Sequence, residues 1–198
     1  MKKIKAKGSA YHWIQHADQI YVAARFLYWK GFPFEFALLG AHVIELYLKA
    51  YLIHKTGEYP EGHELDKIYE ECMKHDDFFN EKSLCGHFLP IKPPLPAREA
   101  TWTYYSHILR YPESLPRRSR PKGVGVVVGV GGTIQTLDCI SHFVRQAVPQ
   151  KGGERDVIDD LINGDGYIWV VHAPDGGDEI RESFLRDNNY FTVKARKR

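Results

Sequence analysis

The stretch AHVIELYLKAYLIHKTG, residues 41–57, decides the fold class that we expect for this chain. Apolar residues in and just before it recur at alternating steps of three and four, a spacing that is typical of one face of an α-helix. Gly57 follows the last of them and is a common helix stop. We therefore expect a long, strongly apolar helix over residues 34–55. Its apolar face is formed by Leu39, Val43, Leu46, Ala50 and Ile53.

One polar stripe interrupts this apolar helix. His42, Glu45 and Lys49 are spaced by three and four residues, so their side chains stack on one side of the helix. A Glu four residues before a Lys is the favourable order for a salt bridge within a helix. Two interpretations are open at this point. The stripe is either a solvated face with one salt bridge, or the polar lining of a subunit interface or ligand cleft, where buried charges need partners.

The sequence on both sides of this helix predicts more helices. Residues 10–30 show the same apolar spacing, and Gly31 and Pro33 end that run. The other helices are expected to be shorter and to lie at about residues 62–75, 97–109 and 133–148. Between them, the segment 76–96 is rich in proline and the segment 112–132 is rich in glycine and arginine, so both are expected to be irregular.

The C-terminal part has a different pattern. YIWVVH (residues 167–172) is rich in strand-forming residues, PDGGD follows it as a turn, and YFTVKA (residues 190–195) is a second candidate strand. We therefore expect a helical domain over residues 1–150 and an extension with a β-hairpin over residues 151–198. The predicted fold class is all-α: an up-and-down bundle of four or five helices with a small C-terminal β-hairpin appendage.

Composition limits the function classes only loosely. The 198 residues are 43% apolar and 26% charged with a formal net charge of +2, so bulk charge does not indicate a nucleic-acid partner. Basic residues do gather locally, at residues 117–122 and 194–198. The chain has three cysteines, no apolar leader after its basic N-terminus and, by inspection, no stretch of membrane-span length. We expect a cytoplasmic protein that does not enter a membrane.

The glycine-rich segment GVGVVVGVGG, residues 123–132, raises the question of a phosphate-binding loop. A dinucleotide fingerprint needs a strand before the glycines and the spacing G-x-G-x-x-G, and neither is present. The chain also lacks the Gly-Lys-Ser or Gly-Lys-Thr sequence of a phosphate loop. The alternating valines favour an extended or hairpin-like connector instead.

Three short elements together resemble the HEPN superfamily of small helical proteins. They are AHVIELYLKAYLIHKTG, GHELDKIYEEC (residues 62–72) and ILRYPES (residues 108–114), in the order that is typical of the family. The opening helix, with Ala17, Asp18 and Ala24, fits the same family. The resemblance covers about residues 10–148. It implies an up-and-down helical bundle that is usually dimeric. Separately, we expect no bound cofactor.

The resemblance also implies two kinds of activity. Many HEPN proteins pair with small nucleotidyltransferases, and others are metal-independent endoribonucleases of toxin–antitoxin and defence systems. The nuclease members carry an Arg, four to six residues and then a His. No Arg in this chain has a His at that distance. His107 and Arg110 lie three residues apart on one predicted helix, so they form a possible catalytic pair in the reverse order.

A zinc site is not expected. Cys72, His75, Cys85 and His87 give the spacing Cys-x2-His and Cys-x-His, and the second pair is tighter than structural zinc sites prefer. His63, at the start of the third predicted helix, has a packing role or a functional one. The tryptophans and tyrosines could stack on bases, although large aromatic side chains usually form the core.

The sequence therefore predicts a HEPN-like, nucleotide- or RNA-binding accessory protein, a homodimer, in a toxin–antitoxin or defence system. Its phosphate-attracting groove would combine the polar stripe with a later basic segment. The residues of that groove are His42, Glu45, Lys49, Arg110, Tyr111, Arg117, Arg118, Arg120 and Lys122. The alternatives are a divergent endoribonuclease that uses His107 with Arg110, and a module that pairs with a nucleotidyltransferase.

Overall fold

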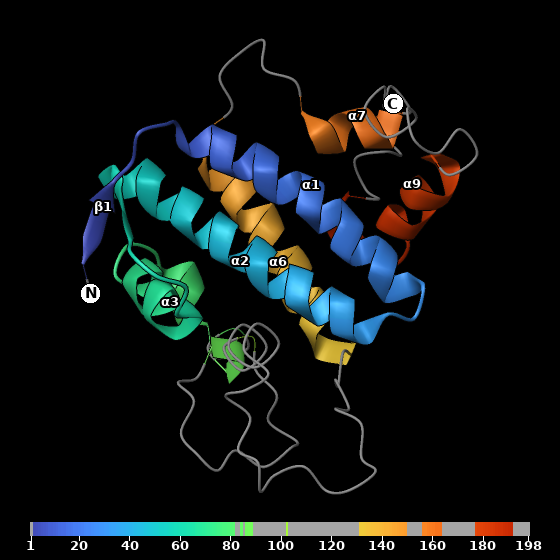
Figure 1. Cartoon of the computed structure of the whole chain (residues 1–198), viewed down its shortest axis with the longest axis horizontal. Coiled ribbons are helices and arrows are strands. Elements are labelled where there is room, and N and C mark those ends of the chain that lie inside the picture. The colour runs from blue at the N-terminus through green and yellow to red at the C-terminus, as the bar shows by residue number, and fades with distance from the viewer. Residues whose placement is uncertain are drawn as a thin grey trace, which may run out of the picture.

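The computed structural model describes residues 2–81, 84, 86–88, 102, 131–149, 156–163 and 177–191. Within these residues the protein is a helical bundle with one small sheet, so the all-α fold class is confirmed. Figure 1 shows α1 and α2 side by side, with α6 crossing behind them. The predicted helix over residues 97–109 lies outside the described residues, apart from the helical and buried Trp102.

The first two helices form an antiparallel pair, as predicted. Helix α1 spans Ala10–Trp29 and α2 spans Pro33–Thr56. Gly31 takes a positive φ of 79° in the turn between them, which costs a residue without a Cβ little. Pro33 occupies the first turn of α2, where its missing N–H is not needed. Gly57 ends α2 in the left-handed conformation, with φ 76°.

Helix α2 is the centre of the core. By length and composition alone, this helix could cross a membrane. The expectation that no stretch of the chain reaches membrane-span length is therefore wrong. However, 83% of its most apolar 18-residue window is buried inside the protein, as in the core helix of a globular bundle. Gly40 of α2 allows the ring of Trp102 to lie directly against the helix backbone.

A two-stranded antiparallel sheet closes one end of the bundle, and the sequence did not predict it. Strand β1 (Lys3–Lys5) pairs with β2 (Glu58–Pro60), with Ile4 opposite Tyr59. Helix α3 follows over Leu65–Met73, later than the predicted start near Gly62. The start is later because Gly62 adopts a φ of 99°, which an α-helix cannot contain. Short 3-10 turns follow at Asp77–Asn80 and Gly86–Phe88.

The later helices pack on the same core. Helix α6 spans Gly131–Ala147, close to the predicted 133–148, and contacts both α1 and α2. Helices α7 (Val157–Asn163) and α9 (Gly177–Leu185) pack on α1. A strand beginning at Tyr190 is wrong, because residues 189–191 are helical. The other predicted strand, residues 167–172, lies outside the described residues, as does the glycine-rich segment 123–130.

Candidate functional site

The structure brings part of the predicted site together and leaves part of it undescribed. His42, Glu45 and Lys49 lie on α2 as the helical spacing predicted. The other predicted site residues lie outside the described residues: His107, Arg110, Tyr111, Arg117, Arg118, Arg120 and Lys122. The geometry of a site can therefore be built from α2 and from what packs against it.

Glu45 and Lys49 are buried, and His63 joins them from the loop before α3. Lys49 Nζ donates to Glu45 Oε1 at 2.8 Å and to the carbonyl oxygen of Gly62 at 2.7 Å. His63 Nδ1 lies 2.7 Å from the same Glu45 Oε1. The side chains of Glu45 and Lys49 are 3% and 6% exposed, whereas that of His63 is 60% exposed. We call these three residues the Glu45 cluster.

Local backbone geometry explains how the cluster forms. The positive φ of Gly62 turns the chain between β2 and α3, and this brings the Gly62 carbonyl and the His63 ring to α2. The ring of Tyr59, in β2, lies 5.6 Å from Lys49 Nζ in a cation–π contact. Trp13 of α1 packs on that ring at a centroid distance of 4.9 Å. The sequence singled out Glu45 and Lys49 as site residues and left the role of His63 open, and the separation of 18 positions between Glu45 and His63 meant that their contact could not be read from the sequence.

Burial excludes one of the two interpretations of the polar stripe. The salt bridge between Glu45 and Lys49 is confirmed, but a solvated face is wrong because both side chains are inside the protein. Breaking a buried pair by removing one partner leaves an uncompensated charge, which is strongly destabilising. His42 is half-buried. The exposed part of the cluster is the His63 imidazole, which Glu45 contacts through Nδ1, so Nε2 is the ring nitrogen that could serve a ligand or a proton transfer.

A second polar network joins α1, α2 and α6. Tyr47 donates to Asp18 Oδ1 at 2.5 Å, and Arg145 pairs with both Asp18 and Asp156. Burial raises the pKa of the Asp18 carboxyl, and the nearby Arg145 opposes that rise. The Arg145 guanidinium thus binds α6 to α1 and to the residue just before α7. Sequence reasoning quoted Asp18 only as part of a family pattern and did not foresee this role.

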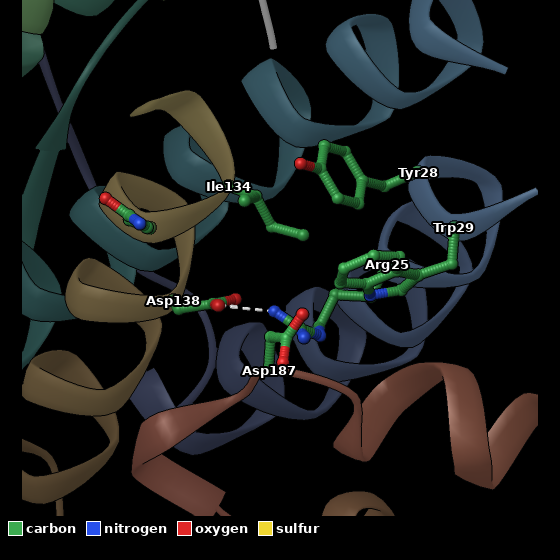
Figure 2. Close-up of a pocket in the computed structure, with 7 residues that line it drawn as sticks. Arg25, Tyr28, Trp29, Ile134, Asp138 and Asp187 are labelled. Atoms are coloured by element: carbon green, nitrogen blue, oxygen red, sulfur yellow. Dashed lines mark hydrogen bonds and ion pairs between the residues drawn. The ribbon is translucent and has the colours of Figure 1, made fainter. Parts of the chain in front are cut away.

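A third network borders a partly open cavity at the far end of α1. Arg25 is fully buried and pairs with Asp138 of α6, while its Nε donates to the Phe184 carbonyl oxygen at 2.9 Å. Burial raises the pKa of Asp138, and the Arg25 charge opposes this. Figure 2 shows this pair on the wall of the cavity. The cavity is lined by Arg25, Tyr28, Trp29, Ile134, Gln135, Asp138 and Asp187.

The described residues hold no group of three or more His, Cys, Asp or Glu side chains that could bind a metal ion. Cys72, one of the four residues weighed as a zinc set, is buried and its Sγ faces the Leu48 carbonyl oxygen at 3.7 Å. Burial raises the pKa of this thiol, which disfavours the thiolate that a zinc ligand requires. Cys85 lies outside the described residues.

Comparison with known protein families gives a match. A family model described as "HEPN domain" matches residues 10–114, which is more than half of the chain. The matched segment contains α1, α2, the sheet partner β2, α3 and the Glu45 cluster. No curated protein and no solved structure matches the chain.

Proposed function

The chain belongs to the HEPN domain family, and from this premise we propose that it is a nucleotide- or RNA-binding accessory protein. The observation that carries the proposal is the family match itself, because HEPN membership points to a function related to nucleotides or RNA. We extend the proposal to a homodimer that works in a toxin–antitoxin or defence system, with a nucleotidyltransferase as its possible protein partner.

Two features of the chain support binding of a phosphate backbone. The first is the basic run Arg117, Arg118, Arg120 and Lys122, which places four positive charges within six residues. The second is the exposed imidazole of His63, which Glu45 holds in place. Cationic side chains that neutralise phosphates release bound counterions, so binding of this kind weakens steeply with salt.

The test is a native gel shift with end-labelled single-stranded RNA at several salt concentrations. One variant changes Arg117, Arg118, Arg120 and Lys122 to Ala. The matched control changes Lys194, Arg196, Lys197 and Arg198 to Ala, which removes the same number of charges from the other basic run. If each of the four contacts one phosphate, the slope of log K against log salt falls by about 3 in the first variant. The control keeps the wild-type slope.

Two results would overturn the binding of RNA through a phosphate groove. One is the absence of any shift with the wild-type protein at low salt. The other is an affinity that does not change with salt, because a phosphate-binding groove cannot behave in that way. A loss of binding that is equal in both variants would place the effect in net charge rather than in the segment 117–122.

The same tubes, run on a denaturing gel with chelator present, test the endoribonuclease alternative. Cleavage that disappears in His107→Ala and in Arg110→Ala would make the protein a divergent nuclease, although it lacks the Arg-to-His spacing of the nuclease members. Co-purification of a nucleotidyltransferase without any RNA shift would favour the protein-interaction module instead.

A further inference from the structure

The cavity at the end of α1 is separate from the Glu45 cluster, and nothing in the proposed function uses it. Its walls come from three distant parts of the chain: the last turns of α1, the first turns of α6 and the segment after α9. Figure 2 shows side chains from these three parts converging on one hollow. Its volume is about 130 Å³. A cavity of about 150 Å³ admits benzene, so the volume of this one limits a buried ligand to about one six-membered ring.

The walls of the cavity are held rigidly by Arg25. Besides its ion pair with Asp138, its guanidinium donates to the carbonyl oxygens of Phe184 and Arg186, at 2.9 and 2.5 Å. These bonds fix α1, α6 and the segment after α9 relative to one another. A site built on such a fixed frame keeps its shape before a ligand arrives, which lowers the cost of binding.

The lining combines flat aromatic surface with groups that can form hydrogen bonds. Tyr28 and Trp29 pack edge to face, with ring centroids 4.9 Å apart. The Trp29 Nε1 donor is buried and has no hydrogen-bond partner among the described residues, which costs free energy unless a ligand or water satisfies it. The exposed Asp187 lines the same cavity and brings a carboxylate to it. The site therefore combines one orphaned donor with one exposed anionic acceptor.

We propose that this cavity binds a pyrimidine base that carries an exocyclic amine, as in cytosine. The amine would donate a hydrogen bond to the Asp187 carboxylate. A ring nitrogen or the carbonyl oxygen of the base would accept a hydrogen bond from the Trp29 N–H. Carboxylates accept from the cytosine amine in known base contacts. Uracil places a carbonyl oxygen where cytosine has the amine, so it would bring an acceptor against the Asp187 carboxylate. This inference rests on the proposed function, because it names the base that a bound nucleotide or RNA would present.

The first test uses the free nucleotides CMP and UMP, which differ only in the base. Binding is followed by NMR through the indole N–H signal of Trp29, which is assigned by its disappearance in Trp29→Phe. We expect CMP to shift that signal and UMP to bind about 10-fold more weakly, as one well-placed base contact provides. Asp187→Asn supplies a donor as well as an acceptor, so the preference for CMP should fall to about none.

Glu182→Gln is the matched control, because it removes an exposed carboxylate one turn earlier on α9 without touching the cavity. It should keep the preference of the wild-type protein. Asn tolerates the left-handed conformation that Asp187 adopts, so Asp187→Asn is expected to fold. Equal binding of CMP and UMP, or an unshifted Trp29 signal, would overturn the inference.

The second test uses the RNA oligomers C8 and U8 in the native gel shift, to separate a base within RNA from a free nucleotide. A preference for C8 that Asp187→Asn abolishes would place the cytosine of an RNA strand in the cavity. A response to CMP with no preference between the oligomers would assign the cavity to free nucleotides. Equal shifts of C8 and U8 with no response to CMP would leave RNA binding standing and overturn the inference. No binding of any of the four ligands would overturn both.

Discussion

Asp187 lines the cavity and also adopts an unusual backbone conformation. Its φ of 51° lies in the left-handed region, where Gly is free of strain and Asp is tolerated better than most residues. We expect Asp187→Ala to be less stable than Asp187→Gly by about 1 kcal/mol, because a Cβ without a polar side chain suffers the full steric cost. Urea denaturation of the two variants measures the difference. Equal stabilities would show that the left-handed conformation is not kept in solution.

Glu71 makes a residue-scale prediction about pH. It accepts from Lys3 of β1 at 2.5 Å and from Lys74 at 2.6 Å, and these hydrogen bonds lower its pKa from 4.5 to about 2. A depressed carboxyl pKa stabilises the folded state above the unfolded pKa, and this stabilisation is lost as the pH falls toward the folded pKa. Glu71→Gln should therefore be less stable than wild type at pH 6 and nearly equal to it at pH 2.

The measurement is the difference in denaturant midpoint between wild type and Glu71→Gln across that range of pH. Glu64→Gln is the control, because Glu64 accepts from Lys67 in an exposed pair and its removal should cost little at any pH. A Glu71→Gln deficit that stays constant down to pH 2 would show that the two lysines do not hold this carboxylate in solution.

At the scale of elements, the contact between α2 and the helical residue Trp102 depends on Gly40. A Cβ added at Gly40 would lie 2.6 Å from Cη2 of the Trp102 ring and 2.8 Å from its Cζ3, so the ring would have to move. We expect Gly40→Ala to destabilise the protein by about 1–3 kcal/mol, as overpacking does, despite the better helix propensity of Ala. Trp102→Phe removes both of the ring atoms in question. The double variant should therefore be more stable than the sum of the two single effects by about 1 kcal/mol or more.

Thermal or denaturant unfolding of the four proteins in this cycle gives the coupling. Additive effects of the two substitutions would mean that the ring does not pack on Gly40. An independent check is tryptophan fluorescence, since the emission of Trp102 should shift when the ring is displaced from its buried position.

The elements themselves were predictable where their signals are local. Helix α2 differs from its predicted range of 34–55 by one residue at each end, because Pro33 and Gly57 mark its ends in the sequence. The β1–β2 sheet was not predictable, because it pairs Ile4 with Tyr59 across more than fifty residues and both strands have only three residues. The strand expected from Tyr190 is helical at its start, so strand propensity did not decide the local structure there.

The contacts of the candidate site were likewise predictable only where they are local in the sequence. Glu45 and Lys49 could be paired from the sequence because four residues along a helix bring side chains together. The contacts of Glu45 with His63 and of Arg25 with Asp138 span 18 and 113 residues, and only the fold reveals them. The available signal for the cavity was Arg25 itself, a charged residue within the predicted helix over residues 10–30, because such a residue needs a partner elsewhere in the chain when it is buried.

At the scale of the whole molecule, buried charges tie the C-terminal helices to the bundle. Arg25 of α1 holds Asp138 of α6 and the carbonyl oxygens of Phe184 and Arg186, at and just after the end of α9. Phe184 and Phe191 belong to the same apolar core as Tyr21. We therefore expect residues 156–191 to unfold together with α1 and α6 in a single transition, rather than as a separate unit.

Arg25→Met tests this coupling, because it leaves the Asp138 carboxylate buried without its cationic partner, with the Tyr21 hydroxyl still donating to it. The expected loss is about 3–5 kcal/mol. Changing Asp138 to Leu in the same chain should restore part of it, since an apolar pair avoids the cost of burying charge, while the Phe184 and Arg186 carbonyl oxygens still lack the guanidinium. Lys30→Met is the control: Lys30 also links α1 to α9, through Glu179, but the pair is exposed and should contribute less than about 1 kcal/mol.

Amide hydrogen exchange locates the effect within the molecule. In the wild-type protein the amides of α9 and α6 should exchange with similar, high protection, because both open only when the whole bundle unfolds. In Arg25→Met the protection of both helices should fall by the same free energy as the stability. If the α9 amides alone lost protection while α6 kept the wild-type rates, the C-terminal helices would be an independently opening unit. Arg25 would then serve to dock that unit, and the base-binding cavity would exist only in the docked state, since Asp187 forms part of its wall.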